Sequence, residues 1–216
     1  MKKSKKGKIF VQIASYRDPE LLPTIDDMLK KAKNPENLVF GICWQYDSSE
    51  PIDMFDGQKQ FRVSKHHYSE SEGLGWARHI TNTLYDGEEY TLQIDSHMRF
   101  IKNWDEEVIN MLEELKSKSI KKPLLTGYVS SYDPTNDPDG RVQEPWEQVF
   151  DRFIPEGTVF TLPQVIPNWQ ELTGPIPTRF YSAHFCFVDG SFVDEVPHDP
   201  KLYFHSEEMS IAVRAF

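Results

Sequence analysis

The sequence lacks the features that mark several classes of protein. It has two cysteines, Cys43 and Cys186, which are too few for a disulfide scaffold and are not spaced as a metal site. No run of about 20 apolar residues is present, which excludes a membrane-spanning helix. The basic N-terminus leads into an apolar run too short for a signal peptide. Because both cysteines lie in apolar runs, we expect buried thiols and a cytoplasmic, reducing location.

Positive charge is also scarce. The chain has 24 Lys and Arg against 34 Asp and Glu, a formal net charge of −10. Binding to a nucleic-acid backbone needs clustered cations, so we expect no nucleic-acid partner. The only dense basic run is residues 2–8, "KKSKKGK". It indicates an anion-binding arm only weakly, and we expect a frayed, solvated terminus.

The 216 residues suffice for one domain with a sizeable core. Apolar and β-branched runs predict buried strands, and apolar residues at helical spacing predict amphipathic helices. Strands are expected at 8–16, 38–47, 60–68, 90–100 and 122–132, and helices at 17–32, 73–85 and 103–118. The strand at 60–68 is more polar and is expected near an edge. This alternation predicts an α/β fold with a mixed, mostly parallel central sheet flanked by helices.

The second half has a different character. Residues 132–145 form a loop rich in Pro, Asp and Gly, and residues 150–180 are rich in Pro and aromatics with little helical period. A strand and turn are expected at 181–197. A helix is expected to begin after Ser206 as its N-cap and to be cut short at Phe216, so residues of a longer protein would be missing. No repeat or linker is evident. We therefore expect a single domain, with a nucleotide-binding half at 1–130 and an acceptor-side half at 131–216.

The stretch "YTLQIDSHMRF" begins as a buried strand and then brings Asp95, Ser96 and His97 together. Residues two apart on a strand point the same way, so Asp95 and His97 are expected to face a common point. One carboxylate and one imidazole, with open positions, suit Mn²⁺ or Mg²⁺ that also holds phosphate oxygens. Since imidazole is the softer ligand, it favours Mn²⁺. An aspartate that merely ends a strand, beside a histidine bonded to a carbonyl, is the alternative.

Four motifs in order, "IFVQIASYRDPEL", "GLGWARHITNTLY", "QIDSHMRF" and "FHSEEMSIAVRAF", resemble a known family. They are similar to the UDP-GlcNAc:polypeptide N-acetylglucosaminyltransferases that modify hydroxyproline, and more distantly to the polypeptide GalNAc-transferases. The resemblance covers nearly the whole chain. It implies a GT-A fold, a UDP-sugar donor, a divalent cation and retention of anomeric configuration. It also implies a hydroxyl-bearing polypeptide or glycan as acceptor.

The resemblance also implies roles for individual residues on the donor side. Asp95 and His97 would hold the metal, and Ser96 lies between them at the substrate. Asp47 would accept a hydrogen bond from uracil, or else be a turn aspartate. On the donor side, the loop after the first strand is also implied to contact substrate through Ser15, Tyr16 and Arg17. The Gly-rich segment after the third expected strand is implied to do so through Gly73, Gly75 and Arg78. For Arg17 the alternative is a surface ion pair with Asp18 or Glu20.

On the acceptor side, the resemblance gives Glu207 and Glu208 the catalytic role of positioning the acceptor or sugar hydroxyls. At a helix start they also gain from the helix dipole regardless of function. His184 and Trp169 would floor the sugar pocket, or belong to the core. Related enzymes take a further His ligand from a later segment, which the chain lacks. His205 precedes the helix and is expected to be wrongly placed for that role.

Two other functions remain open at this point. A sugar-1-phosphate nucleotidyltransferase shares the architecture but needs a Gly-rich basic loop after the first strand, which "ASYRDPEL" does not supply. A non-catalytic domain that binds a UDP-sugar or glycan is the second. The missing histidine ligand favours this possibility, because binding without turnover tolerates an incomplete metal site.

Overall fold

The computed structural model describes residues 5–51, 53–137, 140, 142 and 144–216. A six-stranded sheet forms its centre, in the order β3-β2-β1-β4-β8-β5. β1 pairs in parallel with β2 and β4, and β2 with β3, whereas β8 is antiparallel to both β4 and β5. The strands are β1 (Lys5–Tyr16), β2 (Leu38–Tyr46), β3 (Phe61–His67), β4 (Glu88–Asp95), β5 (Leu125–Thr126) and β8 (Phe185–Asp189). The predicted mixed, mostly parallel α/β sheet is confirmed.

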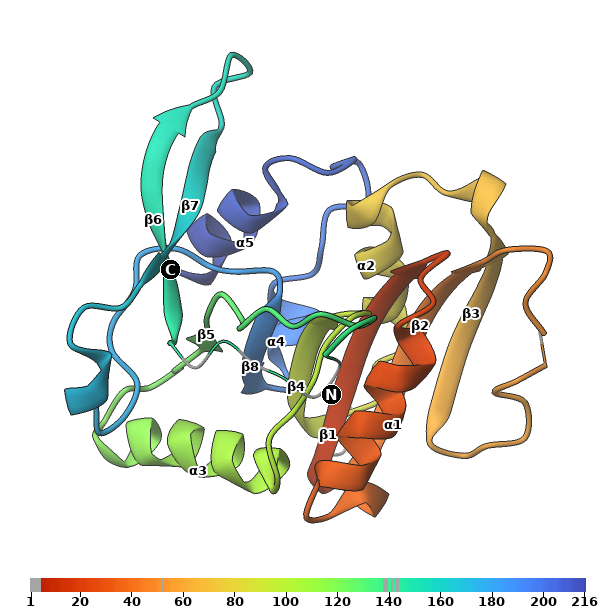
Figure 1. Ribbon diagram of the computed structural model, residues 1–216, viewed down its shortest axis with the longest axis horizontal. Helices are drawn as coiled ribbons and strands as arrows, with labels where there is room; N and C mark the ends of the chain where they lie inside the picture. Colours follow the sequence, from red (N-terminus) through yellow and green to blue (C-terminus); the bar gives the residue numbers. More distant parts are fainter. Residues whose placement is uncertain (1–4, 52, 138–139, 141, 143) are drawn as a thin grey trace.

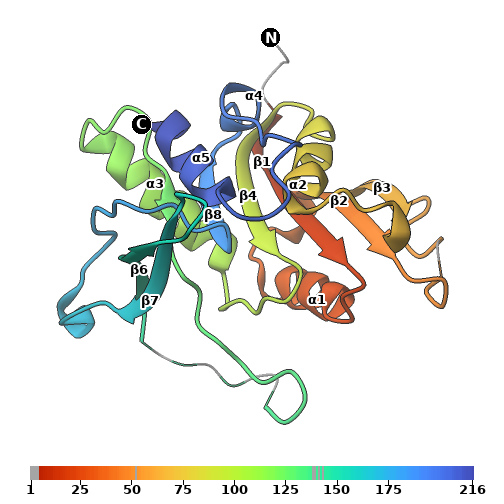
Figure 2. The ribbon, with the colours of Figure 1, turned by 90° about the horizontal axis from the view of Figure 1, so that it is seen from above.

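Helices cover both faces of this sheet, as Figure 2 shows for α1 on one side and α2 and α4 on the other. The α-helices are α1 (Leu21–Lys31), α2 (Leu74–Thr83), α3 (Trp104–Ser117), α4 (Phe192–Glu195) and α5 (Glu207–Ala215). Short 3₁₀ turns lie at Pro35–Asn37, Tyr68–Glu70 and Trp169–Glu171. Alternate residues of β1 serve the two layers: Ile9, Val11 and Ile13 pack in one cluster and Phe10 in another.

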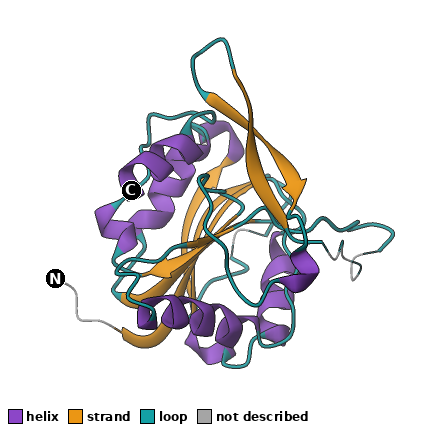
Figure 3. Cartoon of the chain, turned by 90° about the vertical axis from the view of Figure 1, so that its left-hand side faces the viewer, coloured by secondary structure: helices purple, strands orange, loops and turns teal. Residues whose placement is uncertain are grey.

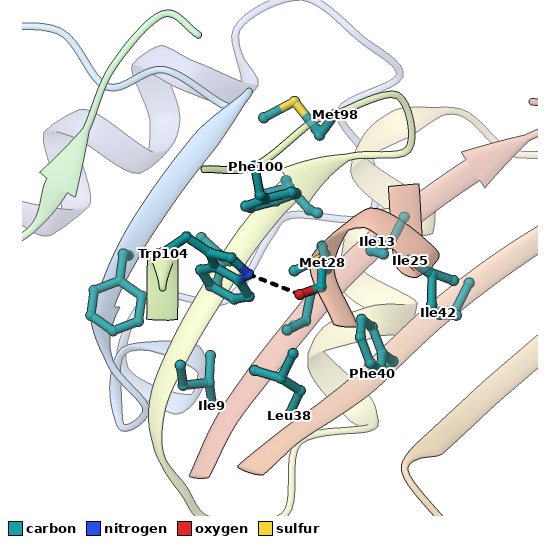
Figure 4. Packing of buried hydrophobic residues seen from close by; sticks show 14 of the residues in the cluster. Ile9, Ile13, Ile25, Met28, Leu38, Phe40, Ile42, Met98, Phe100 and Trp104 are labelled. Carbon is teal, nitrogen blue, oxygen red and sulfur yellow. Dashed lines mark hydrogen bonds between the residues drawn. The ribbon is translucent and has the colours of Figure 1, made fainter. Parts of the chain in front are cut away.

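The largest hydrophobic cluster lies between the sheet and helices α1 and α3 (Figure 4). Met28 and Phe40 are fully buried there, and the buried Trp104 donates its indole N–H to the Met28 carbonyl at 3.0 Å. This bond ties the start of α3 to α1. Leu112 of α3 is fully buried in this cluster, whereas the neighbouring Met111 is exposed. The layer holds the strands rigidly, so their carboxyl ends form a fixed rim.

A separate two-stranded sheet, β6 (Trp146–Phe153) and β7 (Val159–Val165), projects beyond the main body beside α5 (Figures 1 and 3). The sequence analysis missed this hairpin, because prolines and aromatics hide the strand alternation. β5 also contains only two residues, far fewer than the strand expected at 122–132. The hairpin is relevant to the site described below because Gln148 of β6 and Val159–Thr161 of β7 line the same cavity as residues of the main sheet.

Some details predicted for individual elements are confirmed by the structure and others are not. β3 is the edge strand, as expected, and Pro23 lies in the first turn of α1. The expected frayed basic terminus is wrong for Lys5 onward, which opens β1, while residues 1–4 lie outside the described residues. Ser206 occupies the N-cap position of α5 but makes no capping hydrogen bond. No helix of the described residues is long and apolar enough to cross a membrane.

Candidate active site

The carboxyl ends of the parallel strands β1, β2 and β4 meet at one rim. Ala14 of β1 pairs with Cys43 of β2 on one side and with Asp95 of β4 on the other. A cavity of 540 Å³ opens at this rim. Residues from both halves of the chain line it, among them Tyr16, Asp18, Arg78, Asp95, His97, Tyr128, Gln148, His184, Glu207 and Glu208. Ligands of open α/β sheets bind at such strand ends, so this cavity is the candidate site.

Asp95 and His97 converge at the floor of the cavity. Asp95 ends β4, and the Nε2 atom of His97 lies 3.9 Å from its Oδ2 atom. His97 falls beyond the strand end, so a bend rather than strand alternation brings the two together. Ser96 is buried, and its hydroxyl donates to Asp18 Oδ2 at 2.5 Å. Ser96 also lines the cavity, and its contact with substrate stays a prediction.

Asp18 is a candidate site residue that the sequence analysis did not single out. Its Oδ2 atom lies 2.7 Å from Nδ1 of His97, which turns Nε2 of the ring toward Asp95. Burial tends to raise the pKa of Asp18, but hydrogen bonds from His97, Ser96 and the Glu20 amide together lower it. The same bond raises the pKa of His97 against the opposing effect of burial. Asp18 stands next to a proline at a helix start, where an aspartate is so common that it gave no signal.

The donor set fits a divalent cation that shares its ligands with phosphate. Asp95 offers an oxygen and His97 an Nε2 nitrogen, and a carboxylate holds the other ring nitrogen, as metal-binding histidines usually require. His184 Nε2 lies 3.8 Å from the same Asp95 oxygen. Across the described part of the chain, no group of three or more His, Cys, Asp or Glu could hold an ion alone. Diphosphate and water would therefore have to complete the coordination.

Arg78 lines the cavity, but its charge is engaged by the protein itself. Its side chain is buried and joins two carboxylates, with Nη2 at 2.9 Å from Asp95 Oδ1 and Nε at 3.2 Å from Glu207 Oε1. Burial opposes the charge of Arg78, but Glu207 and Asp95 together raise its pKa. Its guanidinium is engaged by the protein, where contact with uracil or diphosphate was predicted. Arg78 thus couples the floor of the cavity to helix α5.

Glu207 and Glu208 begin α5, and their carboxylates have different partners. Glu207 is buried; burial alone would raise its pKa, but Arg78 lowers it, and its Oε1 atom also lies 3.1 Å from Nδ1 of His198. Glu208 accepts the backbone N–H of Ala183 on Oε1 at 2.8 Å, on the cavity wall. Only Glu208 is placed to meet a hydroxyl without breaking a buried ion pair.

The residues predicted around the nucleoside divide into two groups. Tyr16 is half exposed on the cavity wall and meets Tyr68 edge-on, with ring centroids 6.4 Å apart. Arg17 lies over the Tyr68 ring at 4.5 Å and pairs with Asp47 at 3.0 Å, not with Asp18 or Glu20. Ser15, by contrast, is fully buried and does not line the cavity. Tyr16, Arg17, Asp47 and Tyr68 thus form one surface beside the cavity.

Gly73 and Gly75 allow the chain to approach itself. The Leu74 and Gly75 amides donate to the carbonyls of Tyr203 and Leu202 at 2.7 and 3.1 Å. A Cβ atom at Gly75 would lie 2.2 Å from the Leu202 oxygen, and Gly75 does not line the cavity. The two glycines therefore allow close packing against the segment before α5, and the predicted approach to a nucleotide stays a prediction.

Of the remaining predicted residues, two histidines line the cavity and the others do not. His184 lines the cavity and packs on Tyr128, with ring centroids 4.4 Å apart. His205, expected to be wrongly placed, also lines the cavity. Trp169 lies in a 3₁₀ turn and is not among the residues that line the cavity. The cysteines are buried free thiols, as expected.

Comparisons with known proteins agree with this geometry. The model of the family "Glycosyltransferase (GlcNAc)" matches residues 8–60 and 53–216. No curated protein sequence matches the chain. GalNAc-T7, crystallised with UDP, GalNAc and Mn²⁺, superposes with a TM-score of 0.67 at 15% identity, over 96% of this chain and 40% of that one. Residues 1–349 of S. aureus TarS give 0.57 at 15% identity, over 97% and 55%.

The chain therefore spans about half the length of these solved structures or less. At 15% identity the two likenesses establish the fold alone, which is the GT-A fold of glycosyltransferases. They do not extend to the residues of the site. The assignment of those residues rests on the geometry described above.

Proposed function

We propose, from the premise that this chain belongs to the glycosyltransferase (GlcNAc) family, that it moves GlcNAc or a related hexosamine from a UDP-sugar to a hydroxyl. The acceptor would be a polypeptide, as in the hydroxyproline-modifying enzymes, or a glycan, and the setting cytoplasmic. The observation that carries the proposal is the Asp95–His97 pair, oriented by Asp18 at the floor of the cavity. It supports a metal-dependent transferase, and the resemblance to the hydroxyproline-modifying enzymes implies that the transfer is retaining.

The donor would lie across the rim of the sheet. Mn²⁺ or Mg²⁺, when bound by Asp95 and His97, supplies positive charge that stabilises the departing diphosphate. Tyr16 and Tyr68 offer aromatic surface for the uracil ring, and the adjacent Asp47 carboxylate can accept the uracil N–H. Arg17, already paired with Asp47, can turn toward phosphate. These contacts support nucleotide binding by residues 1–130.

The transferred sugar and the acceptor would lie toward the second half, residues 131–216. Glu208 faces the cavity with its carboxylate held by the Ala183 amide, and can orient a hydroxyl. We assign no enzymic nucleophile, because transfer with retention does not require one. Catalysis would come from positioning and from electrostatic help to the leaving group.

The test is calorimetric titration of UDP with and without Mn²⁺. Asp95→Asn and His97→Gln keep the side-chain shapes, and each is expected to weaken Mn²⁺-dependent affinity by about 10- to 100-fold or more. Asp194→Asn, an exposed carboxylate on α4, serves as the control. If the affinity for UDP is the same with and without Mn²⁺ and is unchanged by Asp95→Asn, the proposed metal–diphosphate site is contradicted.

Binding without turnover is the second candidate, favoured by the lack of a self-sufficient metal cluster in the described residues. Mass spectrometry of UDP-GlcNAc incubated with Mn²⁺ and the chain separates the two. Release of UDP above a protein-free control supports the enzyme. Tight UDP-GlcNAc binding without release, even after many hours, supports the binding domain.

A further inference from the structure

A glutamine on the projecting hairpin reaches the wall of the cavity. Gln148 of β6 is only 7% exposed, although residues Phe150 and Phe153 on the same strand are half exposed or more. Its side chain lines the cavity and donates from Nε2 to Glu208 Oε1 at 3.3 Å. The hairpin is therefore anchored to the start of α5 by an amide that also faces the candidate ligand space.

The orientation of this amide follows from its partner. An ionised carboxylate only accepts hydrogen bonds, so the NH₂ group of Gln148 must face Glu208 and the carbonyl must point the other way. The Oε1 atom of Gln148 is buried and has no hydrogen-bond partner in the structure. Buried amide oxygens are nearly always hydrogen-bonded, so this acceptor requires an explanation.

Glu208 adds a second acceptor at the same place. The Ala183 amide and Gln148 both donate to Oε1, and neither donates to Oε2. Gln148 and Glu208 together thus present acceptor oxygens, and their matching ligand must supply O–H or N–H donors. A phosphate group has no such donors at neutral pH and would be repelled by Glu208. A sugar ring, with hydroxyls and an acetamido N–H, has the matching chemistry.

The position of this pair relates it to the donor. Ala183, which binds Glu208, is followed by His184, whose Nε2 atom lies 3.8 Å from Asp95 Oδ2. The transferred sugar is bonded directly to the diphosphate, so a diphosphate at Asp95 places the ring within reach of this wall. Val159 and Phe160 of the hairpin also line the cavity and offer apolar surface to a ring face.

We propose that Gln148 and Glu208 form the hydroxyl-recognition subsite for the transferred sugar of the donor, with Gln148 as a specificity-determining residue carried by the β6–β7 hairpin. The inference deepens the proposed function and rests on it. It gives the hairpin a direct part in donor selection.

The experiment compares UDP with UDP-GlcNAc, each titrated in the presence of Mn²⁺. Gln148→Leu keeps the approximate size and removes both polar atoms. It is expected to weaken UDP-GlcNAc binding about tenfold, the value of one buried hydrogen bond, and to leave UDP binding within about twofold. Gln164→Leu, an exposed glutamine on β7, is the matched control and should change neither affinity.

A second variant guards against misfolding of the hairpin. Glu208→Gln keeps an acceptor for the Ala183 amide, yet its own NH₂ group can block a sugar donor, so it too should weaken UDP-GlcNAc selectively. Equal losses for UDP and UDP-GlcNAc in both variants would mean a purely structural role and overturn the subsite. Unchanged UDP-GlcNAc affinity in both variants would also overturn it, as would a loss of affinity for the acceptor alone.

These outcomes separate the two proposals. If wild-type chain binds UDP but Gln148→Leu does not discriminate, the subsite is wrong and the proposed function stands. If wild-type chain binds neither UDP nor UDP-GlcNAc, the proposed function is wrong and the subsite falls with it.

Discussion

At the scale of single residues, Asp18 controls the titration of His97. The two form a hydrogen-bonded pair that lowers the pKa of Asp18 and raises that of His97. We expect NMR titration of the metal-free protein to give a His97 pKa above 6.5, and Asp18→Asn to bring it down. Asp194→Asn is the control. A His97 pKa unchanged by Asp18→Asn would contradict the pairing.

The Asp18–His97 pair also makes the stability of the folded protein depend on pH. The raised His97 pKa contributes stability that is present below about 6.5 and is lost as the pH rises through the folded value. The lowered Asp18 pKa contributes stability above its ordinary value of 3.8, lost as the pH falls through the folded value. The stability difference between wild type and Asp18→Asn should therefore be largest between about pH 4 and 6.5.

Glu207 carries a second prediction at this scale. Glu207→Gln leaves Arg78 buried with Asp95 alone, so we expect a loss of about 3 kcal/mol in the free energy of unfolding, measured in urea. Glu114→Gln removes the exposed ion pair with Lys118 and should cost less than about 1 kcal/mol. Similar losses for both variants would mean that Glu207 is not part of a buried ion pair.

Residue types alone predicted the centre of the site better than its edges. The Asp-x-His spacing located Asp95 and His97, and the paired glutamates located the start of α5. Arg78 was identified, but its two carboxylate partners were not, because sequence does not show that Asp95 and Glu207 close around it. Asp18, Gln148 and Tyr68 join the site only through contacts between distant segments, and no local pattern marks them.

At the scale of elements, the first turn of α2 depends on the absence of a side chain at Gly75. A Cβ atom at Gly75 would lie 2.2 Å from a backbone oxygen of Leu202. Gly75→Ala must push that segment away, and we expect a loss of about 1–3 kcal/mol in urea unfolding. Gly174→Ala has nothing within 4 Å and should change stability by less than about 0.5 kcal/mol. Equal effects would show that the two segments do not touch.

β1, β2 and β4 were predictable because each is largely buried on both faces and reads as a continuous apolar run. β6 and β7 were not, because a hairpin outside the core has no single buried face to impose an alternation. Phe153 is 66% exposed, for example, and Pro163 lies within β7, where a proline is unusual. The antiparallel direction of β8 was also invisible, since strand pairing depends on the whole path of the chain.

At the scale of the molecule, the sheet and the hairpin should differ in stability. The three hydrophobic clusters of the described residues contain no residue of β6 or β7. We expect hairpin amides to exchange with deuterium about 100-fold faster than those of β1 and β4, as followed by mass spectrometry. Slow exchange throughout the hairpin would instead indicate that it unfolds only with the sheet.

The position of β8 in the sheet has a consequence for how the protein is made. β4 receives β1 on one side early, but its other edge waits for a strand that lies about 90 residues later in the chain. At about 5–20 residues per second on a ribosome, that edge stays open for roughly 5–18 s. During that interval the strand bearing Asp95 is a template for pairing with other nascent chains. Chaperone binding to the growing polypeptide would therefore matter most just before residue 185 emerges.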